Sequence, residues 1–136
     1  MTEWLFIDTN VFMRIVLDDH PEMSPRARRL LERVALREVR ATTSVTVIFE
    51  LVYGLEVIQR VPKPRVRDAV VPIVSLEALE IHDRDSILLA LAWYATHNTP
   101  FADAYHAASA NRRGIPAVCS FDRHFDRFPG IRRVEP

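Results

Sequence analysis

The stretch Trp4-Leu5-Phe6-Ile7-Asp8-Thr9-Asn10 decides the fold class, because an apolar run ends at an aspartate and a helical pattern follows directly. A short continuous apolar run is typical of a strand buried in a parallel sheet. From Asn10 to Leu17 the apolar residues recur with helical spacing. The sequence therefore predicts a strand, a turn and a helix, with Asp8 at the carboxyl end of the strand.

The same arrangement recurs near the other end of the chain. Residues 116–119 form a short apolar run, and Asp122 follows it. Two more short runs, at 39–42 and 78–81, predict further strands. Apolar spacing predicts helices at 10–17, 25–35, 44–60, 63–74, 83–96 and 103–112. Short strands that do not alternate, separated by helices, favour an α/β fold in which helices cover both faces of a parallel sheet.

Proline and glycine residues set the expected ends of these helices. Ser24 and Pro25 are typical of a helix N-cap and first position, and Pro62 is expected to stop the helix at 44–60. Pro72 is expected to interrupt or end the helix at 63–74. Gly114 is expected to close the last helix as a C-terminal cap.

Length and composition fit a single domain that spans residues 1–136. A chain of this length with 49% hydrophobic residues forms one ordinary core. The single cysteine, Cys119, falls in the apolar run at 116–119, so we expect it to be buried in a strand and to suit a reducing cytoplasm. The N-terminus has no signal-peptide pattern, and no apolar run reaches the ~18 residues of a membrane span. We therefore expect a cytoplasmic protein without a membrane segment.

The formal net charge is zero, but the charges are unevenly distributed along the chain. Residues 24–67 carry ten basic and four acidic side chains, a net charge of +6, and the rest carries eight basic and fourteen acidic ones, a net charge of −6. A basic region and an acidic region suit an enzyme that holds a phosphate backbone on one surface and cations in another. Ordinary charged helix faces would give the same counts.

Three aspartates stand where parallel sheets bind their ligands. Asp8 and Asp122 follow predicted strands, and Asp103 begins a predicted helix after the loop at 98–102. Because ligands of open parallel sheets bind at the carboxyl ends of the strands, we expect these carboxylates to meet at one edge. Each aspartate taken alone is also typical of a helix cap.

Glu50 interrupts a run of residues that otherwise has the pattern of a buried helix. The polar positions Glu56 and Arg60 lie on the other side of this helix, so Glu50 is predicted to point inward or into a cleft. A carboxylate in that position requires a partner, which is a metal ion, a helix N-terminus or a distant arginine. Four carboxylates form an all-oxygen ligand set, which favours Mg²⁺ or Mn²⁺ over zinc.

Four segments in this order resemble the PIN-domain nucleases and, within that family, the VapC-like toxins of bacterial toxin–antitoxin pairs. They are Phe6-Ile7-Asp8-Thr9-Asn10, Ser44-Val45-Thr46-Val47-Ile48-Phe49-Glu50-Leu51-Val52-Tyr53-Gly54-Leu55, Phe101-Ala102-Asp103-Ala104-Tyr105-His106-Ala107-Ala108 and Ser120-Phe121-Asp122-Arg123-His124-Phe125. The resemblance implies a three-layer α/β/α fold with a central, mostly parallel sheet.

The resemblance also implies the roles of individual residues. Asp8, Glu50, Asp103 and Asp122 would be the acidic residues that hold the metal and carry out catalysis. Asn10 and Ser120 would be nearby polar helpers, although many relatives have threonine in place of Ser120. Asp126 is a candidate outer ligand or a solvated charge. His106 is interpreted as a packing or surface residue.

These observations lead to the hypothesis of metal-assisted endonucleolytic cleavage of RNA. The resemblance adds a cognate antitoxin that blocks the cleft, growth inhibition on expression, and a homodimer. Two alternatives are a free-standing PIN-type RNA-processing nuclease and a non-catalytic module that keeps the fold. A dehalogenase-like phosphatase would need an aspartate where Asn10 stands and a phosphate-neutralising lysine, but the only lysine, Lys63, lies between two prolines.

Overall fold

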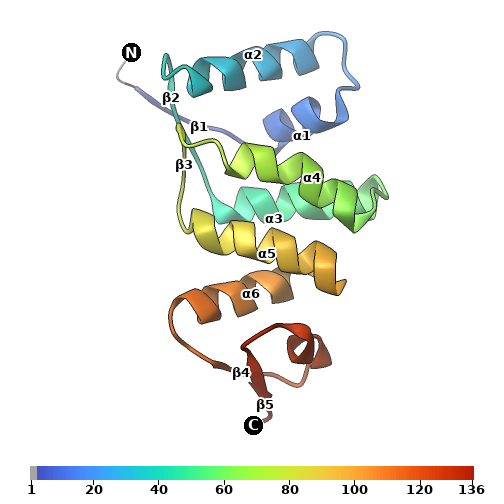
Figure 1. The fold of residues 1–136 in the computed structure, drawn as a ribbon. Coiled ribbons are helices and arrows are strands. Elements are labelled where there is room, and N and C mark those ends of the chain that lie inside the picture. Colours follow the sequence, from blue (N-terminus) through green and yellow to red (C-terminus); the bar gives the residue numbers. More distant parts are fainter. Residues whose placement is uncertain (1–2) are drawn as a thin grey trace.

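A computed structural model describes residues 3–136; Met1 and Thr2, the start of the N-terminus interpreted above, lie outside the described residues. Helices and short strands alternate along the chain (Figure 1). The strands are β1 (Trp4–Phe6), β2 (Arg40–Thr43), β3 (Leu79–Ile81), β4 (Ala117–Cys119) and β5 (Arg132–Val134). The α-helices are α1 (Thr9–Leu17), α2 (Met23–Ala35), α3 (Val45–Tyr53), α4 (Lys63–Val74), α5 (Arg84–His97) and α6 (Phe101–Arg112). The short helices are η1 (Gly54–Ile58), a π-helix, and η2 (Arg123–Arg127), a 3₁₀-helix.

All strand pairs described are parallel, as predicted for an α/β protein, but they belong to two sheets. β1, β2 and β3 form one sheet in that order, and β4 pairs with β5 in the other. Leu5 lies opposite Ala41, which in turn lies opposite Leu79. Figure 1 shows the first sheet near the N-terminus and the second near the C-terminus, with helices between them. The parallel α/β class is therefore confirmed, whereas the expected single central sheet is divided.

The two faces of the β1–β3 sheet have different surroundings. The side chains of Ala41, Thr43, Leu79 and Ile81 are buried against the helices. On the opposite face Trp4 and Phe6 are exposed, and Figure 1 shows the helices to one side of this sheet. Helices on both faces were expected. In the described part of the chain, no helix covers the face of this sheet on which Trp4 and Phe6 lie.

Capping residues account for the start of α3 and the end of α6, whereas Ser24, expected to be an N-cap, lies inside α2, which begins at Met23. Ser44 caps α3, because its side-chain oxygen accepts a hydrogen bond from the backbone N–H of Val47 at 3.3 Å. Gly114 has a φ of 73°, and its N–H donates to the carbonyl of Asn111. The next N–H, that of Ile115, donates to Ala110, so α6 ends in a Schellman motif as expected for a glycine cap.

Several local expectations were wrong. The helix expected at 44–60 changes from α to π geometry at Gly54, and Pro72 lies inside α4 without ending it. Cys119 is exposed, because β4 lies in a two-stranded sheet that does not cover it. The elements β5 and η2 were not predicted. In residues 3–136 no helix has the length and apolar character needed to cross a membrane.

The junction between β1, β2 and α3 fixes the backbone that leads to Asp8. The buried hydroxyl of Thr43 donates a hydrogen bond to the carbonyl of Ile7 at 2.8 Å. The N–H of Ile7 donates to the carbonyl of Thr42 at 2.9 Å. Both bonds cross from β2 to the residue that precedes Asp8, so they hold the end of β1 in place.

We predict that Thr43→Val lowers the free energy of unfolding by about 1–3 kcal/mol, because valine keeps the shape of threonine but leaves a buried carbonyl without its donor. Urea unfolding followed by circular dichroism measures the change. Thr46→Val, at an exposed position of α3, is the matched control, and we expect it to change stability by less than about 0.5 kcal/mol. Equal stability of the two variants would contradict the assigned role of Thr43.

Candidate metal centre

Three side chains from the C-terminal part of the chain form a group able to hold a cation. Asp103 lies in the first turn of α6, where Pro100 precedes the helix. Asp122 follows β4 and caps η2, and His124 lies within η2. Ligand atoms of these three residues all lie within 4.8 Å of one another. Asp103 and Asp122 border an open pocket of about 400 Å³ together with Ser120.

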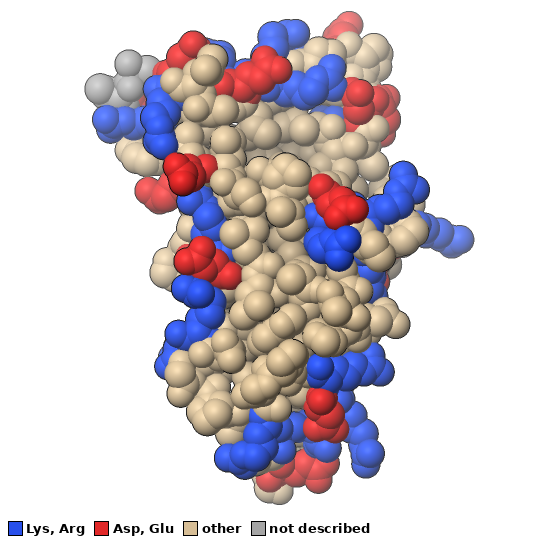
Figure 2. Space-filling model, in the orientation of Figure 1, with Lys and Arg blue, Asp and Glu red and all other residues tan. Residues whose placement is uncertain are grey.

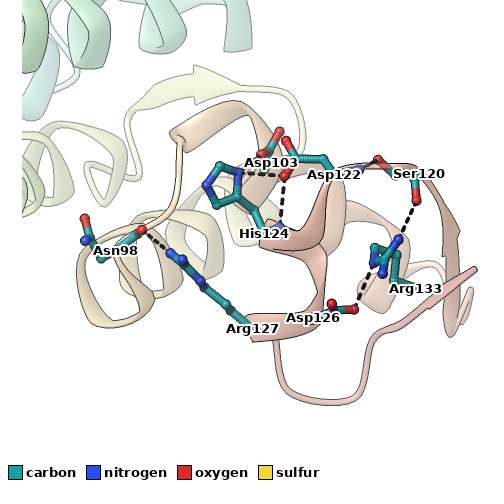
Figure 3. A network of polar contacts seen from close by, with 8 residues as sticks. All are labelled: Asn98, Asp103, Ser120, Asp122, His124, Asp126, Arg127 and Arg133. Carbon is teal, nitrogen blue, oxygen red and sulfur yellow. Dashed lines mark hydrogen bonds and ion pairs between the residues drawn. The ribbon is translucent and has the colours of Figure 1, made fainter.

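His124 is the centre of this group, as Figure 3 shows. Its ring Nδ1 lies 3.2 Å from Oδ2 of Asp103 and 2.8 Å from Oδ1 of Asp122. The backbone N–H of His124 also donates to Oδ1 of Asp122 at 2.9 Å. The hydroxyl oxygen of Ser120 accepts a hydrogen bond from the backbone N–H of Asp122 at 2.9 Å. Short local hydrogen bonds therefore orient the Asp122 carboxylate toward Asp103.

The two carboxylates have different electrostatic surroundings. Burial raises the pKa of Asp103 above its ordinary value, and the negative charge of Asp122 raises it further. The pKa of Asp122 is lowered, chiefly because the backbone N–H of His124 donates a hydrogen bond to its charged form. A cation between the two groups would remove the repulsion that acts on Asp103.

The donor set fits a divalent ion. Two carboxylates and an imidazole offer oxygen and nitrogen ligands, which suit Mn²⁺ well and Mg²⁺ through the oxygens. The His124 ring contacts both carboxylates. Asp103 and Asp122 would bind the ion. The His124 ring would either bind it as a third ligand or rotate away from it.

Asp8 and Glu50 lie in a different pocket, which has a volume of about 430 Å³. Asp8 comes directly after β1 and Ile7, and Glu50 projects from α3. Asn10 borders the same pocket, and so does Thr9, whose buried hydroxyl has no hydrogen-bond partner within residues 3–136. The structure thus brings Asp8, Glu50 and Asn10 together, as the sequence predicted for this part of the site.

The four predicted acids do not form one cluster within a single chain. Asp103 and Asp122 share one pocket and Asp8 and Glu50 share the other. Among the described residues, Asp103, Asp122 and His124 form the one group in which three potential metal ligands converge. The division follows the division of the strands, because β1 and β4 belong to different sheets.

Glu50 borders a cleft, as predicted, but it is exposed instead of pointing inward. Thr46, Tyr53 and Val57 are also exposed, so Glu50 belongs to a solvent-facing stripe of α3 and η1. The same pocket contains Arg14, which forms an ion pair with Asp19 at 3.2 Å. Because the Glu50 carboxylate is exposed, its position costs little desolvation free energy.

The structure also shows what His124, Asp126 and His106, the polar residues near this pocket, contact. Sequence reasoning did not include His124 in the site, although its position two residues after Asp122 was a usable signal. Asp126 is exposed and its Oδ1 lies 3.0 Å from Nε of Arg133, so it is occupied by an ion pair. His106 is exposed, as expected for a surface residue, and borders the pocket.

Positive charge is less concentrated than the sequence counts suggest. Figure 2 shows lysine and arginine side chains intermixed with aspartate and glutamate on the visible face. Four basic residues of the segment 24–67 form ion pairs with acids, namely Arg28 with Asp18, Arg33 with Glu38, Lys63 with Glu56 and Arg67 with Asp68. A separate groove of about 620 Å³ contains Arg14 and Arg26 and shares Asn10 with the Asp8 pocket.

Comparison with known proteins relates the whole of this architecture to one family. The PIN domain model matches residues 5–131. VapC ribonuclease Mb1869c of Mycobacterium bovis is 31% identical over 142 residues, which cover 96% of this chain and 98% of that protein. Ribonuclease VapC23 of Mycobacterium tuberculosis is 33% identical over 87% of this chain and 92% of its own length. A VapC ribonuclease of Aquifex aeolicus is 25% identical over 96% of this chain and 95% of its own length.

We predict that Asp103→Asn weakens Mn²⁺ binding at least about tenfold, because it removes one anionic ligand from the group. Titration of free Mn²⁺ by electron paramagnetic resonance measures the affinity. Asp126→Asn removes one negative charge from a nearby exposed position and should leave the affinity unchanged. The same affinity in both variants would show that the Asp103 group does not bind the ion.

Proposed function

The chain belongs to the PIN-domain family, and from this premise we propose that it is a divalent-metal-dependent endoribonuclease that serves as the toxin of a toxin–antitoxin pair. The observation that carries the proposal is the nearly full-length similarity to proteins named VapC ribonucleases. The family match at residues 5–131 includes all four predicted acids. The proposed substrate is RNA, and the proposed location is the cytoplasm.

In this proposal Asp8, Glu50, Asp103 and Asp122 are the acids that bind Mg²⁺ or Mn²⁺, with Asp103 and Asp122 in one pocket and Asp8 and Glu50 in the other. The bound ion would supply positive charge at the scissile phosphate and activate water for the attack. The protein's own groups set the positions of its ligands: Ser120 and the backbone N–H of His124 orient Asp122. Nδ1 of His124 lies within 3.2 Å of Asp103 and 2.8 Å of Asp122, so its ring can position both carboxylates.

Two features support RNA as the substrate. Arg14 and Arg26 border a groove that shares Asn10 with the Asp8 pocket, and guanidinium groups bind phosphates in a bidentate manner. Asn10, as a polar helper beside Asp8, would position the phosphate or a bound water. Contacts of this kind hold a nucleic-acid backbone without reading its sequence.

We predict that the purified protein cleaves RNA in the presence of Mn²⁺ or Mg²⁺ and that EDTA abolishes the cleavage. Asp8→Asn and Asp103→Asn should each lower the rate on the order of a hundredfold or more, because each removes a metal ligand. A gel assay with end-labelled RNA measures the rates. Asp126→Asn is the control and should keep full activity.

Cleavage by both ligand variants at the rate of the unsubstituted protein would refute the assigned site. Absence of cleavage by the unsubstituted protein under all metal conditions would favour the non-catalytic binding module instead. The first outcome would show that the metal-binding residues are wrongly assigned, and the second would show that the proposed activity is wrong.

The toxin role gives a separate prediction. Induced expression should arrest growth, expression of Asp103→Asn should not, and a small DNA-binding antitoxin should co-purify with the protein from its native host. Colony counts after induction measure the effect. A protein that cleaves RNA in vitro but leaves growth unaffected would instead be a free-standing RNA-processing nuclease.

A further inference from the structure

A pocket of about 470 Å³ adjoins the group of Asp103, Asp122 and His124. One of its walls comes from α3 and η1, and the other comes from residues 98–102, between α5 and α6. His124 lines this pocket and also contacts Asp103 and Asp122. Figure 3 shows the ring of His124 between these carboxylates and Asn98, which lines the pocket as well. A group bound in the pocket would therefore lie next to the proposed metal centre.

The walls of this pocket are largely apolar and aromatic. The rings of Phe49 and Phe101 meet edge to face, with their centroids 5.0 Å apart. Tyr53 lines the same pocket, and its side chain is 60% exposed. Unpaired nucleobases stack on aromatic side chains of this kind. The volume also falls within the range of about 300–1,000 Å³ that is typical of small-molecule pockets. Shape and lining therefore suit a flat heterocyclic base.

One charged pair interrupts this apolar lining. Nζ of Lys63 lies 3.3 Å from Oε1 of Glu56, and the two side chains are 20% and 31% exposed. Lys63 also donates to the carbonyl of Thr99 at 2.9 Å, and the hydroxyl of Tyr94 donates to Oε1 of Glu56 at 2.6 Å. Burial raises the pKa of Tyr94, and the hydrogen bond to Glu56 raises it further, so Tyr94 keeps its proton and remains the donor. The network fixes the positions of both charges.

The same network leaves one acceptor and one donor unused. Within residues 3–136, the hydrogen bonds to the Glu56 carboxylate reach Oε1, so Oε2 is left to accept from a ligand. The ammonium group of Lys63 has three N–H bonds and donates two of them, to Glu56 and Thr99. In a half-buried pocket, hydrogen bonds to charged groups are stronger than those between neutral groups. The pocket thus favours a ligand that carries donors beside an acceptor.

We propose that this pocket binds an unpaired guanine of the RNA substrate, with the Watson–Crick edge of the base against Glu56 and Lys63. The N1–H and 2-amino groups would donate to Oε2 of Glu56, and the O6 carbonyl would accept from Lys63. This inference rests on the proposed function for RNA as the substrate. It adds a base preference close to the cleaved phosphodiester. Glu56 and Lys63 would determine specificity and take no part in catalysis.

Guanine matches the unused groups more completely than the other three bases. Its Watson–Crick edge carries two neighbouring donors followed by a carbonyl, and a carboxylate oxygen has lone pairs for both donors. Adenine, cytosine and uracil each present a single donor on this edge, so each would form one hydrogen bond fewer with Glu56. The edge is occupied when guanine is paired in a duplex. The pocket therefore requires a guanine in a loop, a bulge or another single-stranded segment.

Binding of single nucleosides tests the pocket without metal and without cleavage. Competition between nucleosides, followed by saturation-transfer NMR, measures their relative affinities for the unsubstituted protein. Guanosine should bind about tenfold more tightly than adenosine, cytidine or uridine, because it forms one more hydrogen bond to a charged group. Inosine lacks only the 2-amino group of guanosine and should lose most of this advantage. Equal binding of guanosine and inosine would contradict the contact between the 2-amino group and Glu56.

Glu56→Gln distinguishes base recognition from a purely structural role. The amide keeps an acceptor for Tyr94 but places a donor where Oε2 stands, so guanosine should bind within about twofold of the other nucleosides. Glu77→Gln removes the same charge at an exposed position outside the pocket, and this control should keep the preference. Tyr53→Leu removes an exposed ring but leaves the ion pair intact. It should weaken all nucleosides by a similar factor, about fivefold or more, and keep the preference for guanosine.

Three results would overturn the guanine pocket. They are no nucleoside binding at millimolar concentration, equal affinity for guanosine and adenosine, and a guanosine preference that persists in Glu56→Gln. Circular dichroism checks that each variant folds, and if Glu56→Gln does not fold, the nucleoside series and Tyr53→Leu still decide. Because no measurement requires cleavage, failure of the guanosine preference leaves the proposed nuclease activity standing. A protein that prefers guanosine but does not cleave RNA rejects only the proposed function.

Discussion

The strands of this protein are three or four residues long, so their positions depend on backbone hydrogen bonds to neighbouring strands and on the helices packed against them. Parallel pairing gives such strands a second role, because it brings their carboxyl ends, and the residues that follow, to one edge. Pairing of β1 with β2 and of β4 with β5 therefore decides where the acids lie. The location of the carboxylates is a consequence of strand order.

Within the C-terminal half of the site, repulsion between carboxylates is balanced locally. Asp122 receives hydrogen bonds that stabilise its charged form, while Asp103 is partly buried and bears the larger share of the repulsion. The ring of His124 contacts both. Local hydrogen bonds and ring contacts thus accompany the close approach of the two acids and the imidazole. Four acids in the same space would have no such internal compensation.

Local sequence signals predicted the elements well, because capping and helical spacing act over a few residues. Gly114 caps α6 as expected, and Asp8 and Asp122 follow strands, although Ser24, which was expected to be an N-cap, lies inside α2. Strand order was less accessible, since three-residue strands carry too little pattern to specify distant partners. Glu50 was expected to point inward or into a cleft, and it borders a cleft but is exposed; the exposed stripe of α3 and η1 includes apolar Val57, so apolar character did not mark the buried side. His124 was missed because its role depends on Asp103, which lies 21 residues earlier in the sequence.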